Sequence, residues 1–131
     1  MIKVVWVNGC FDILHRGHFE MLRHAKSLGD YLIVGLDDDA KVKQDKGPSR
    51  PYNSLEDRKF ALQSTRYVDK VVKFDSAAQL ELLIKGVSPS VMVVGSDWKG
   101  KPVIGSQYAS NVEYFERIDG YSTTNILENN K

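Results

Sequence analysis

The 131-residue sequence is poor in cysteine, proline and long apolar runs, and each scarcity excludes a class of protein. The single cysteine, Cys10, excludes an internal disulfide framework and is typical of a reducing compartment. No apolar run approaches the roughly 18 residues that a membrane-spanning helix needs, and residues 1–7 are too short for a signal peptide. We therefore expect a cytoplasmic protein that does not associate with a membrane.

An excess of charge of either sign is also missing. Lys and Arg number 18 and Asp and Glu number 17, which gives a formal net charge of +1. This balance gives no reason to expect nucleic acid as a partner, because such binding rests on a clear excess of basic residues. The chain shows no internal repeat, low-complexity segment or linker, and its length predicts a single domain over residues 1–131.

Short apolar runs alternate with helical patterns along the chain. The runs rich in β-branched and aromatic residues cover residues 2–7, 31–36, 70–74, 91–94 and 111–115. One helical pattern covers residues 17–28 and ends at Gly29 as a C-cap, and two others begin after the N-caps Ser54 and Ser76. Strand, helix and strand in this spacing indicate right-handed βαβ units. The sequence therefore predicts an α/β fold with an open, parallel, five-stranded sheet and helices on both faces.

The most informative stretch is residues 7–18, in which an apolar strand runs into a glycine, a turn and two histidines. His15 and His18 lie at the start of a predicted helix, where unpaired backbone N–H groups and the positive end of the helix dipole favour an anion. Imidazole donates hydrogen bonds in its neutral and its charged form. Gly17 between them lets a phosphate or a base approach the backbone closely. Two histidines that simply face solvent are the ordinary alternative, but strand, glycine turn and helix start together are typical of a phosphate-binding edge.

The segment 9–12, Gly-Cys-Phe-Asp, followed by His-Arg-Gly-His at 15–18, resembles the signature of the His-x-Gly-His nucleotidylyltransferases. A second segment, residues 118–124, resembles the Ser-Thr-Thr signature that this family has near its C-terminus. The family has a Rossmann-like fold and moves a nucleotide from a triphosphate onto a phosphorylated acceptor. The resemblance therefore implies one nucleotidylyltransferase domain over residues 1–131, and, as is common in the family, a homodimer.

The resemblance implies in-line attack of an acceptor phosphate oxygen on the α-phosphorus, so the catalytic residues should position phosphates and stabilise their charge. It assigns catalytic roles to His15, His18, Lys46 and Arg117. Lys46 lies in the stretch 41–51, whose glycine and two prolines predict a mobile loop over the active site. Mg²⁺ is expected on the triphosphate, largely hydrated and held by the phosphates, so no metal site is predicted within the protein.

Substrate-binding residues are expected at the carboxyl ends of strands and in the second signature. Asp97 and Trp98 follow the run 91–94 at the edge where open α/β sheets bind ligands, although Trp98 is equally well explained as a core anchor or a subunit contact. Asp12 and Lys46 are expected to bind the acceptor. The predicted nucleotide-binding residues are Gly9, Cys10, Phe11, His15, His18, Arg66, Asp97, Trp98, Arg117, Gly120, Tyr121, Ser122, Thr123 and Thr124. The three carboxylates at 37–39 are interpreted as a helix cap with solvated charge rather than as a metal site.

Two branches of the family compete for the choice of substrates. Residues 8–12 and 46–51 resemble the heptose 1-phosphate adenylyltransferases, whereas residues 66–69, 95–98 and Arg117 resemble glycerol 3-phosphate cytidylyltransferase. The cytidylyltransferases have an arginine at both Arg66 and Arg117, and we expect these positions to lie nearer the nucleotide. We therefore favour transfer of CMP from CTP to glycerol 3-phosphate or a related alcohol or sugar phosphate. The alternative is ATP with a heptose or other sugar 1-phosphate.

A non-catalytic nucleotide-binding regulator is the alternative outside the enzymes. The presence of both histidines, Lys46 and Arg117 argues against it, since a regulator has no need of all four. Replacing His15 with alanine distinguishes the two, because only an enzyme has turnover to lose. The acceptor stays open at this stage, since the predicted helix after Ser76 has no lysine over residues 77–84, where glycerol phosphate enzymes place one that binds substrate.

Overall fold

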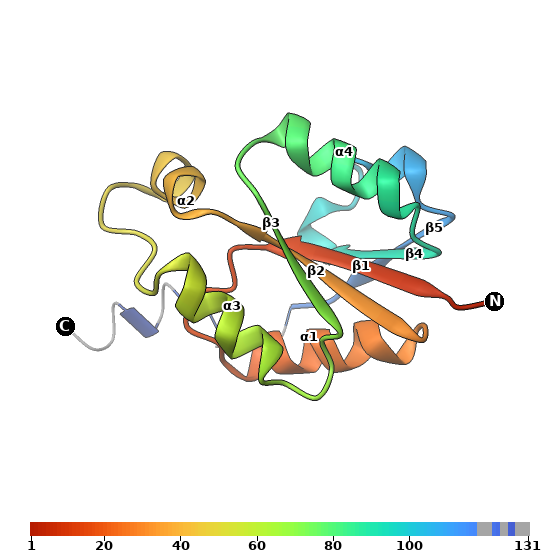
Figure 1. The fold of residues 1–131 in the computed structure, drawn as a ribbon, viewed down its shortest axis with the longest axis horizontal. Helices are drawn as coiled ribbons and strands as arrows, with labels where there is room; N and C mark the ends of the chain where they lie inside the picture. The colour runs from red at the N-terminus through yellow and green to blue at the C-terminus, as the bar shows by residue number, and fades with distance from the viewer. Residues whose placement is uncertain (118–121, 124–125, 128–131) are drawn as a thin grey trace.

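The computed structural model describes residues 1–117, 122–123 and 126–127 (Figure 1). Five strands and four α-helices are found within these residues, together with two short 3-10 helices at Ser96–Trp98 and Ser106–Tyr108. The strands are β1 (Val4–Gly9), β2 (Tyr31–Asp37), β3 (Lys70–Phe74), β4 (Val91–Gly95) and β5 (Asn111–Phe115), and the α-helices are α1 (Arg16–Ser27), α2 (Asp39–Lys46), α3 (Leu55–Gln63) and α4 (Ala77–Val87). Among the residues described, no helix has the length and apolar character that crossing a bilayer requires.

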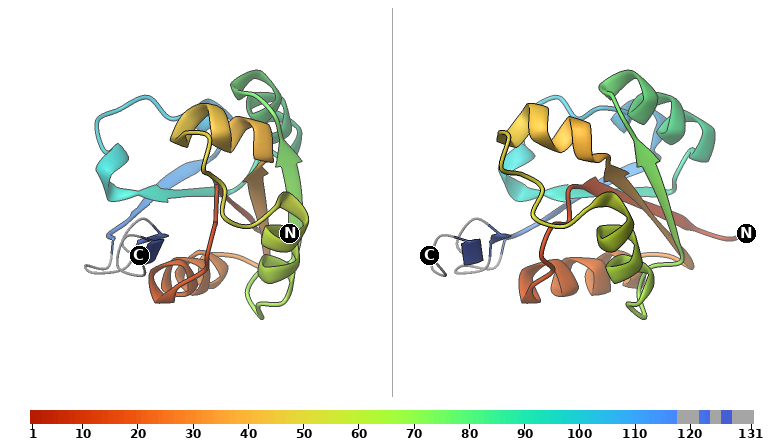
Figure 2. Two further views of the ribbon diagram at one scale, coloured as in Figure 1. Left: turned by 90° about the vertical axis from the view of Figure 1, so that its left-hand side faces the viewer. Right: turned by 60° about the vertical axis from the view of Figure 1, so that its left-hand side comes forward.

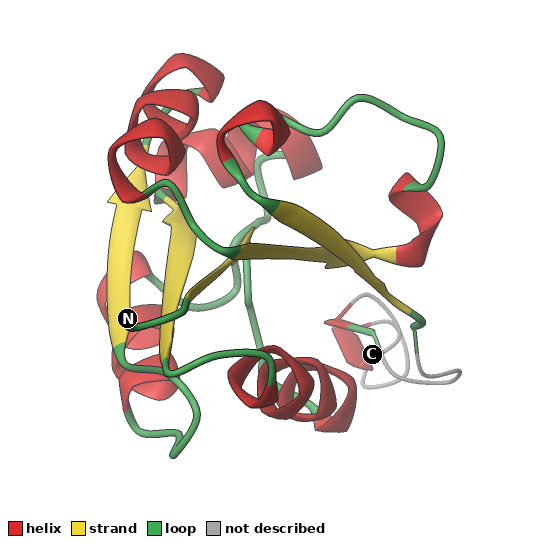
Figure 3. Ribbon diagram, turned by 90° about the vertical axis from the view of Figure 1, so that its right-hand side faces the viewer, coloured by secondary structure: helices red, strands yellow, loops and turns green. Residues whose placement is uncertain are grey.

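All five strands run parallel, in the spatial order β3-β2-β1-β4-β5. The central strand β1 pairs with β2 along its whole length, from Val4 opposite Tyr31 to Gly9 opposite Leu36, and with β4 on its other side. Helices α1 and α3 lie on one face of the sheet, and α2 and α4 lie on the other (Figures 2 and 3). The predicted fold, a Rossmann-like open parallel sheet covered on both faces, is therefore confirmed.

The two faces of β1 belong to separate hydrophobic cores. Val5 packs on the side of α1 and α3, in a cluster with Leu22 and Leu62, whereas Trp6 faces the opposite side, in a cluster with Ile84 of α4. All five side chains are fully buried. A strand that is buried on both faces has no polar alternation, which explains the uninterrupted apolar run that begins the sequence.

Gly35 of β2 makes room for the Trp6 ring. A Cβ atom at Gly35 would lie 2.5 Å from Cζ2 of Trp6, closer than packed atoms approach. The indole Nε1 of Trp6 donates to Oδ1 of Asn8 at 2.9 Å, so the buried N–H is satisfied. This bond orients Asn8 at the carboxyl end of β1, where the ligand pocket begins.

The stretch 41–51, predicted as a mobile loop, is in part helical, because α2 occupies residues 39–46. The Asp38 carboxylate caps the helix by accepting from the Lys41 backbone N–H, which confirms the interpretation of the carboxylate run as a helix cap. Lys41 also pairs with Asp45 at 2.7 Å, one turn along the helix, and Val42 is fully buried. The apolar periodicity of α2 is too weak to predict it, since Val42 is its single buried residue.

The carboxyl ends of all five strands meet at one edge of the sheet. From β1 the chain adds β2 and β3 on one side and then crosses to β4 and β5 on the other, so the strand order reverses between β1 and β4. Open α/β sheets bind ligands at the carboxyl edge beside such a reversal. The fold alone therefore predicts a ligand site at the carboxyl ends of β1 and β4.

Candidate active site

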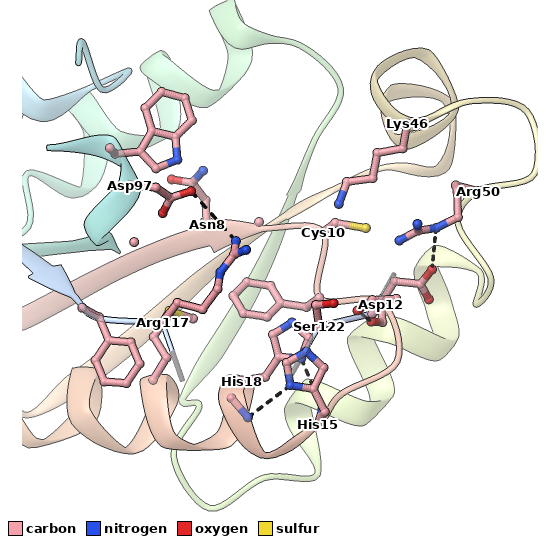
Figure 4. A pocket seen from close by; sticks show the side chains of 18 residues that line it. Asn8, Cys10, Asp12, His15, His18, Lys46, Arg50, Asp97, Arg117 and Ser122 are labelled. Atoms are coloured by element: carbon pink, nitrogen blue, oxygen red, sulfur yellow. Dashed lines mark hydrogen bonds and ion pairs between the residues drawn. The ribbon is translucent and has the colours of Figure 1, made fainter. Parts of the chain in front are cut away.

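A cavity of about 510 Å³ lies at this carboxyl edge, over the ends of β1, β4 and β5 (Figure 4). Its walls come from the β1–α1 loop, the start of α1, the end of α2 with the following loop, and residues 122–123. The residues that line it are Asn8, Gly9, Cys10, Phe11, Asp12, His15, Gly17, His18, Met21, Lys46, Arg50, Gly95, Asp97, Trp98, Phe115, Arg117, Ser122 and Thr123. Segments that are more than 100 residues apart in the chain thus meet around one cavity.

His15 and His18 form the N-terminal cap of α1. Nδ1 of His15 accepts from the Gly17 backbone N–H at 3.1 Å, and Nδ1 of His18 accepts from the His15 backbone N–H at 3.2 Å. The two rings stack with their centroids 3.9 Å apart. Because each Nδ1 acts as an acceptor, a neutral ring carries its proton on Nε2. The cap therefore fixes the same tautomer in both histidines and gives each an Nε2–H donor.

Both histidines are held in the neutral form. The pKa of His18 is lowered to about 4, chiefly by burial and then by electrostatic repulsion from His15 and Lys46, with the nearby Asp12 carboxylate acting in the opposite direction. Burial also lowers the pKa of His15, with the Arg117 charge acting in the same direction. At neutral pH both rings therefore act as hydrogen-bond donors without positive charge, and an incoming polyphosphate finds its cationic partners elsewhere in the cavity.

The low pKa of His18 predicts a loss of stability in mild acid. The unfolded chain binds a proton on this ring near its ordinary pKa of about 6.5, whereas the folded chain does so only near 4. The contribution of His18 to stability is therefore constant above about pH 6.5 and falls between these values. At pH 5 the contribution of His18 to the loss should be about 2 kcal/mol. Urea unfolding at pH 7.5 and pH 5.0 should show that His18→Asn loses about this much less than the wild type. An equal loss in both proteins would show that His18 does not titrate as described.

Three cations line the cavity, and two of them have a carboxylate beside them at a long distance. Nη2 of Arg117 lies 3.9 Å from Oδ2 of Asp97, and Nε of Arg50 lies 3.7 Å from Oδ2 of Asp12. The third, Lys46, is the last residue of α2. Figure 4 shows Arg117 and Asp97 on one side of the histidines and Lys46 and Arg50 on the other. Both ion pairs are longer than a hydrogen bond, so a phosphate oxygen can compete for the guanidinium groups.

Asp12, in the β1–α1 loop, forms hydrogen bonds with residues 52–53 and with Thr123. Its side chain is 1% exposed, and its two carboxylate oxygens accept from the backbone N–H groups of Tyr52 at 2.5 Å and Asn53 at 2.9 Å. Its backbone carbonyl accepts from the hydroxyl of Thr123. The neighbouring Phe11 and Ile13 have left-handed backbone conformations, which cost of order 1 kcal/mol each and need such fixed surroundings. The carboxylate is thus used to hold the loop 50–53, and binding of the acceptor by Asp12 stays a prediction.

Arg58 is a buried residue that is not among the predicted site residues. Its side chain is 0% exposed, and it donates to the backbone carbonyls of Cys10, Asp37 and Asn53 at 2.8–3.0 Å and to the Asp39 carboxylate at 2.8 Å. These partners belong to the β1–α1 loop, the end of β2, the start of α2 and the loop before α3. One guanidinium group therefore fixes the spacing of the segments that form one side of the cavity.

The structure brings most of the predicted site residues together. Of these, Gly9, Cys10, Phe11, Asp12, His15, His18, Lys46, Asp97, Trp98, Arg117, Ser122 and Thr123 line the cavity, whereas Gly120, Tyr121 and Thr124 lie outside the described residues. Trp98 is 48% exposed, so it is not a core anchor. Burial raises the pKa of the Cys10 thiol, which fits a residue that contributes its backbone rather than a thiolate.

Arg66 is the predicted site residue that lies away from the cavity. It belongs to the connection between α3 and β3, and because it precedes a parallel strand it lies at the amino edge of the sheet, opposite the carboxyl edge. Arg50 is the cavity cation that the prediction omitted. Its position in the Lys-Gly-Pro-Ser-Arg-Pro stretch at 46–51 was the available signal.

Comparisons with known proteins identify the family of the chain. A family model described as cytidylyltransferase-like matches residues 6–129. The bifunctional proteins HldE of Campylobacter concisus (strain 13826) and Helicobacter hepaticus (strain ATCC 51449 / 3B1) are each 48% identical over 126 residues, which cover 96% of this chain and 26% of theirs. The chain therefore spans about a quarter of the length of these relatives.

A solved structure resembles the fold. The lipopolysaccharide core biosynthesis protein of Thermoplasma volcanium GSS1 superposes with a TM-score of 0.69 at 23% identity, covering 93% of this chain and 100% of that one. The match of the family model over nearly the whole chain, together with the identity to the HldE proteins, decides the family. The chain belongs to the cytidylyltransferase-like family.

Proposed function

We propose that this domain transfers the adenylyl group of ATP to a heptose 1-phosphate or a related sugar 1-phosphate, with release of pyrophosphate. The observation that carries the proposal is the set of donors around the cavity. Two neutral histidine Nε2–H donors lie between the Arg117 side and the Lys46–Arg50 side, beside the strand-order reversal. Such a row of donors suits a chain of phosphates that runs from a nucleotide to an acceptor.

Three observations support ATP and a sugar phosphate over CTP and glycerol 3-phosphate. The similarity to the HldE proteins favours the heptose phosphate branch of the resemblance over the glycerol phosphate branch. Arg66, one of the two arginines that favoured CTP, lies outside the cavity. The stretch 46–51, which resembles the heptose 1-phosphate adenylyltransferases, contributes both Lys46 and Arg50 to the cavity wall.

The proposed reaction is a direct transfer. An oxygen of the acceptor phosphate attacks the α-phosphorus, a new phosphorus–oxygen bond forms, and the bond to the bridging oxygen breaks so that pyrophosphate leaves with the electron pair. An ionised acceptor phosphate needs no general base, which fits histidines whose pKa is lowered and which act as donors. The protein acts by aligning the two phosphates and by stabilising the charge that develops on their oxygens.

Mg²⁺ enters the proposal as part of the nucleotide. Within residues 1–117, 122–123 and 126–127, no group of three or more His, Cys, Asp or Glu side chains gathers where it could hold a metal ion. The donors that line the cavity are cations and neutral N–H groups, which bind phosphate oxygens and not a metal. We therefore take the substrate to be the Mg²⁺ complex of the triphosphate.

CTP with glycerol 3-phosphate is the second candidate. Gly95, Asp97, Trp98 and Arg117 all line the cavity, and they are among the positions in which the sequence resembles glycerol 3-phosphate cytidylyltransferase. They lie on the side of β4 and β5, away from Lys46 and Arg50. The presence of these residues in the cavity wall favours a cytosine nucleotide on that side. The experiment must therefore compare the activity with ATP and with CTP.

The test is acceptor-dependent release of pyrophosphate with Mg²⁺. ATP and CTP are each combined with a heptose 1-phosphate, a hexose 1-phosphate and glycerol 3-phosphate. We expect kcat/KM for ATP with the heptose phosphate to exceed that for CTP with glycerol 3-phosphate by at least roughly 100-fold, a difference of about 2.7 kcal/mol in transition-state binding. The reverse preference would establish the second candidate. Nucleotide binding without release from any acceptor would favour a non-catalytic regulator.

A further inference from the structure

We propose that Arg50 binds the phosphate group of the acceptor, with Lys46 beside it. The inference rests on the proposed function only in taking the acceptor to be a phosphate monoester, and it does not depend on which nucleotide is used. It adds a specificity-determining residue to the site and separates the cavity into a nucleotide side and an acceptor side.

The position of Arg50 assigns it to the acceptor rather than to the base or ribose. Arg117 follows β5 and Asp97 follows β4, so they flank the reversal between β1 and β4, where open α/β sheets bind the nucleotide. Arg50 and Lys46 come instead from the segment after β2, on the other side of β1 (Figure 4). His15 and His18 lie between the two sides. A nucleotide that reaches the histidines with its phosphates leaves the Arg50 side for the second substrate.

The chemistry of the Arg50 side chain also points to an anion. Its Nε is the only buried side-chain nitrogen or oxygen without a hydrogen-bond partner among the residues that the structure describes. The side chain is 13% exposed, yet Nε lies 3.7 Å from Oδ2 of Asp12, beyond hydrogen-bond length. A buried unpaired N–H is costly, so such groups are rare unless a ligand completes them. A phosphate monoester offers oxygens that match the planar fork of a guanidinium group.

The loop that carries Arg50 is held in place before any substrate arrives. The Asp12 carboxylate accepts from the backbone N–H groups of Tyr52 and Asn53, just after Arg50, and Nζ of Lys43 donates to the Arg50 carbonyl at 3.1 Å. The Asp12 carboxylate also offsets the guanidinium charge in the absence of ligand. Arg50 is thereby fixed in position, which lowers the entropic cost of binding the acceptor.

The experiment compares Arg50→Met and Arg50→Lys with the wild type, and uses Arg23→Met as a matched control. Arg23 is an exposed arginine on α1 that pairs with Glu20 and does not line the cavity. Steady-state kinetics give KM separately for nucleotide and acceptor. Calorimetry with α,β-methylene ATP present, titrated with heptose 1-phosphate, gives the acceptor Kd without turnover, and melting temperatures report on folding.

We expect Arg50→Met to raise the Kd and KM of the acceptor roughly 10- to 100-fold while changing the nucleotide Kd by less than roughly threefold. Arg50→Lys should retain more of the acceptor affinity than Arg50→Met, because lysine keeps the positive charge but lacks the planar guanidinium group that binds two phosphate oxygens. Arg23→Met should change neither constant.

Two results would overturn the inference. One is an unchanged acceptor affinity in a folded Arg50→Met variant, and the other is a loss of nucleotide affinity as large as that of acceptor affinity. If the wild type prefers CTP and glycerol 3-phosphate, the proposed function fails, and the same comparison is made with those substrates and α,β-methylene CTP. The acceptor-specific loss is expected there too, so failure of the proposed function and failure of the Arg50 inference are distinguishable.

Discussion

His18→Asn is expected to lower kcat roughly 10²- to 10³-fold while leaving α1 folded. The Asn Oδ1 atom can take the place of Nδ1 and accept from the His15 backbone N–H, so the helix cap is kept. What the substitution removes is the Nε2–H donor, which the shared cap geometry gives to both histidines. A donor aimed at phosphate oxygens acts mainly on the charge that develops during transfer, so the loss should appear in kcat more than in KM.

His18→Gln is the complementary variant, because its amide N–H₂ reaches toward the position of Nε2 but cannot form the cap. We expect it to retain more activity and less stability than His18→Asn. His24→Asn, on the same helix, outside the cavity and paired with Glu113, should leave kcat unchanged. Equal turnover in His18→Asn and the wild type would contradict the assignment of the Nε2–H groups as donors to the reacting phosphates.

Arg58→Met is expected to lower the free energy of unfolding by about 3 kcal/mol, which is a large part of the stability of a typical domain. The substitution keeps most of the buried volume but leaves the carbonyls of Cys10, Asp37 and Asn53 without their donor. It also removes the partner of Asp39, whose side chain is 42% exposed and is therefore compensated by water. The main cost thus comes from these carbonyls, above all the buried one of Cys10, and not from the lost ion pair.

Urea unfolding measures this loss, with Lys59→Met as a control that removes one positive charge from the same helix. Asp39→Asn, alone and combined with Arg58→Met, completes a double-mutant cycle that isolates the ion pair. We expect a coupling energy of about 1 kcal/mol, well below the total loss. A total loss under about 1 kcal/mol for Arg58→Met would show that the segments around the cavity are held together by other contacts.

The sequence was sufficient to predict the fold, because its signals are local and repeated. Each buried strand of a parallel sheet is a short run of β-branched residues, and N-caps such as Ser54 and Ser76 indicated where helices begin. The missed helix, α2, has a single buried residue and is followed by Gly47 and Pro48, so its stability comes from the Asp38 cap and the Lys41–Asp45 pair rather than from a periodic apolar face.

The site was predictable where its chemistry is local. His15 and His18 cap the helix that they begin, so strand, turn and helix start were enough to find them. Arg50 and Arg58 act on the β1–α1 loop from 38 to 48 residues away, and no spacing rule in the sequence indicates such contacts. Arg66 lies outside the cavity because a residue before a parallel strand belongs to the amino edge of the sheet, and nucleotide binding by it stays a prediction. The homodimer, the cytoplasmic location and the nucleotide stay predictions.

The position of β1 in the sheet has a consequence for folding during synthesis. β1 is the first of the five strands in the sequence and the central strand of the sheet. It is therefore synthesised before either of the strands that pair with it. Chains emerge at about 5–20 residues per second, so β2 and β3 are synthesised before β4 and β5. The cavity lies along the seam between this early half and the late half. Vectorial synthesis therefore supplies last the part of the cavity wall that comes from β4, β5 and the residues after them, following the segments around β1 and α2.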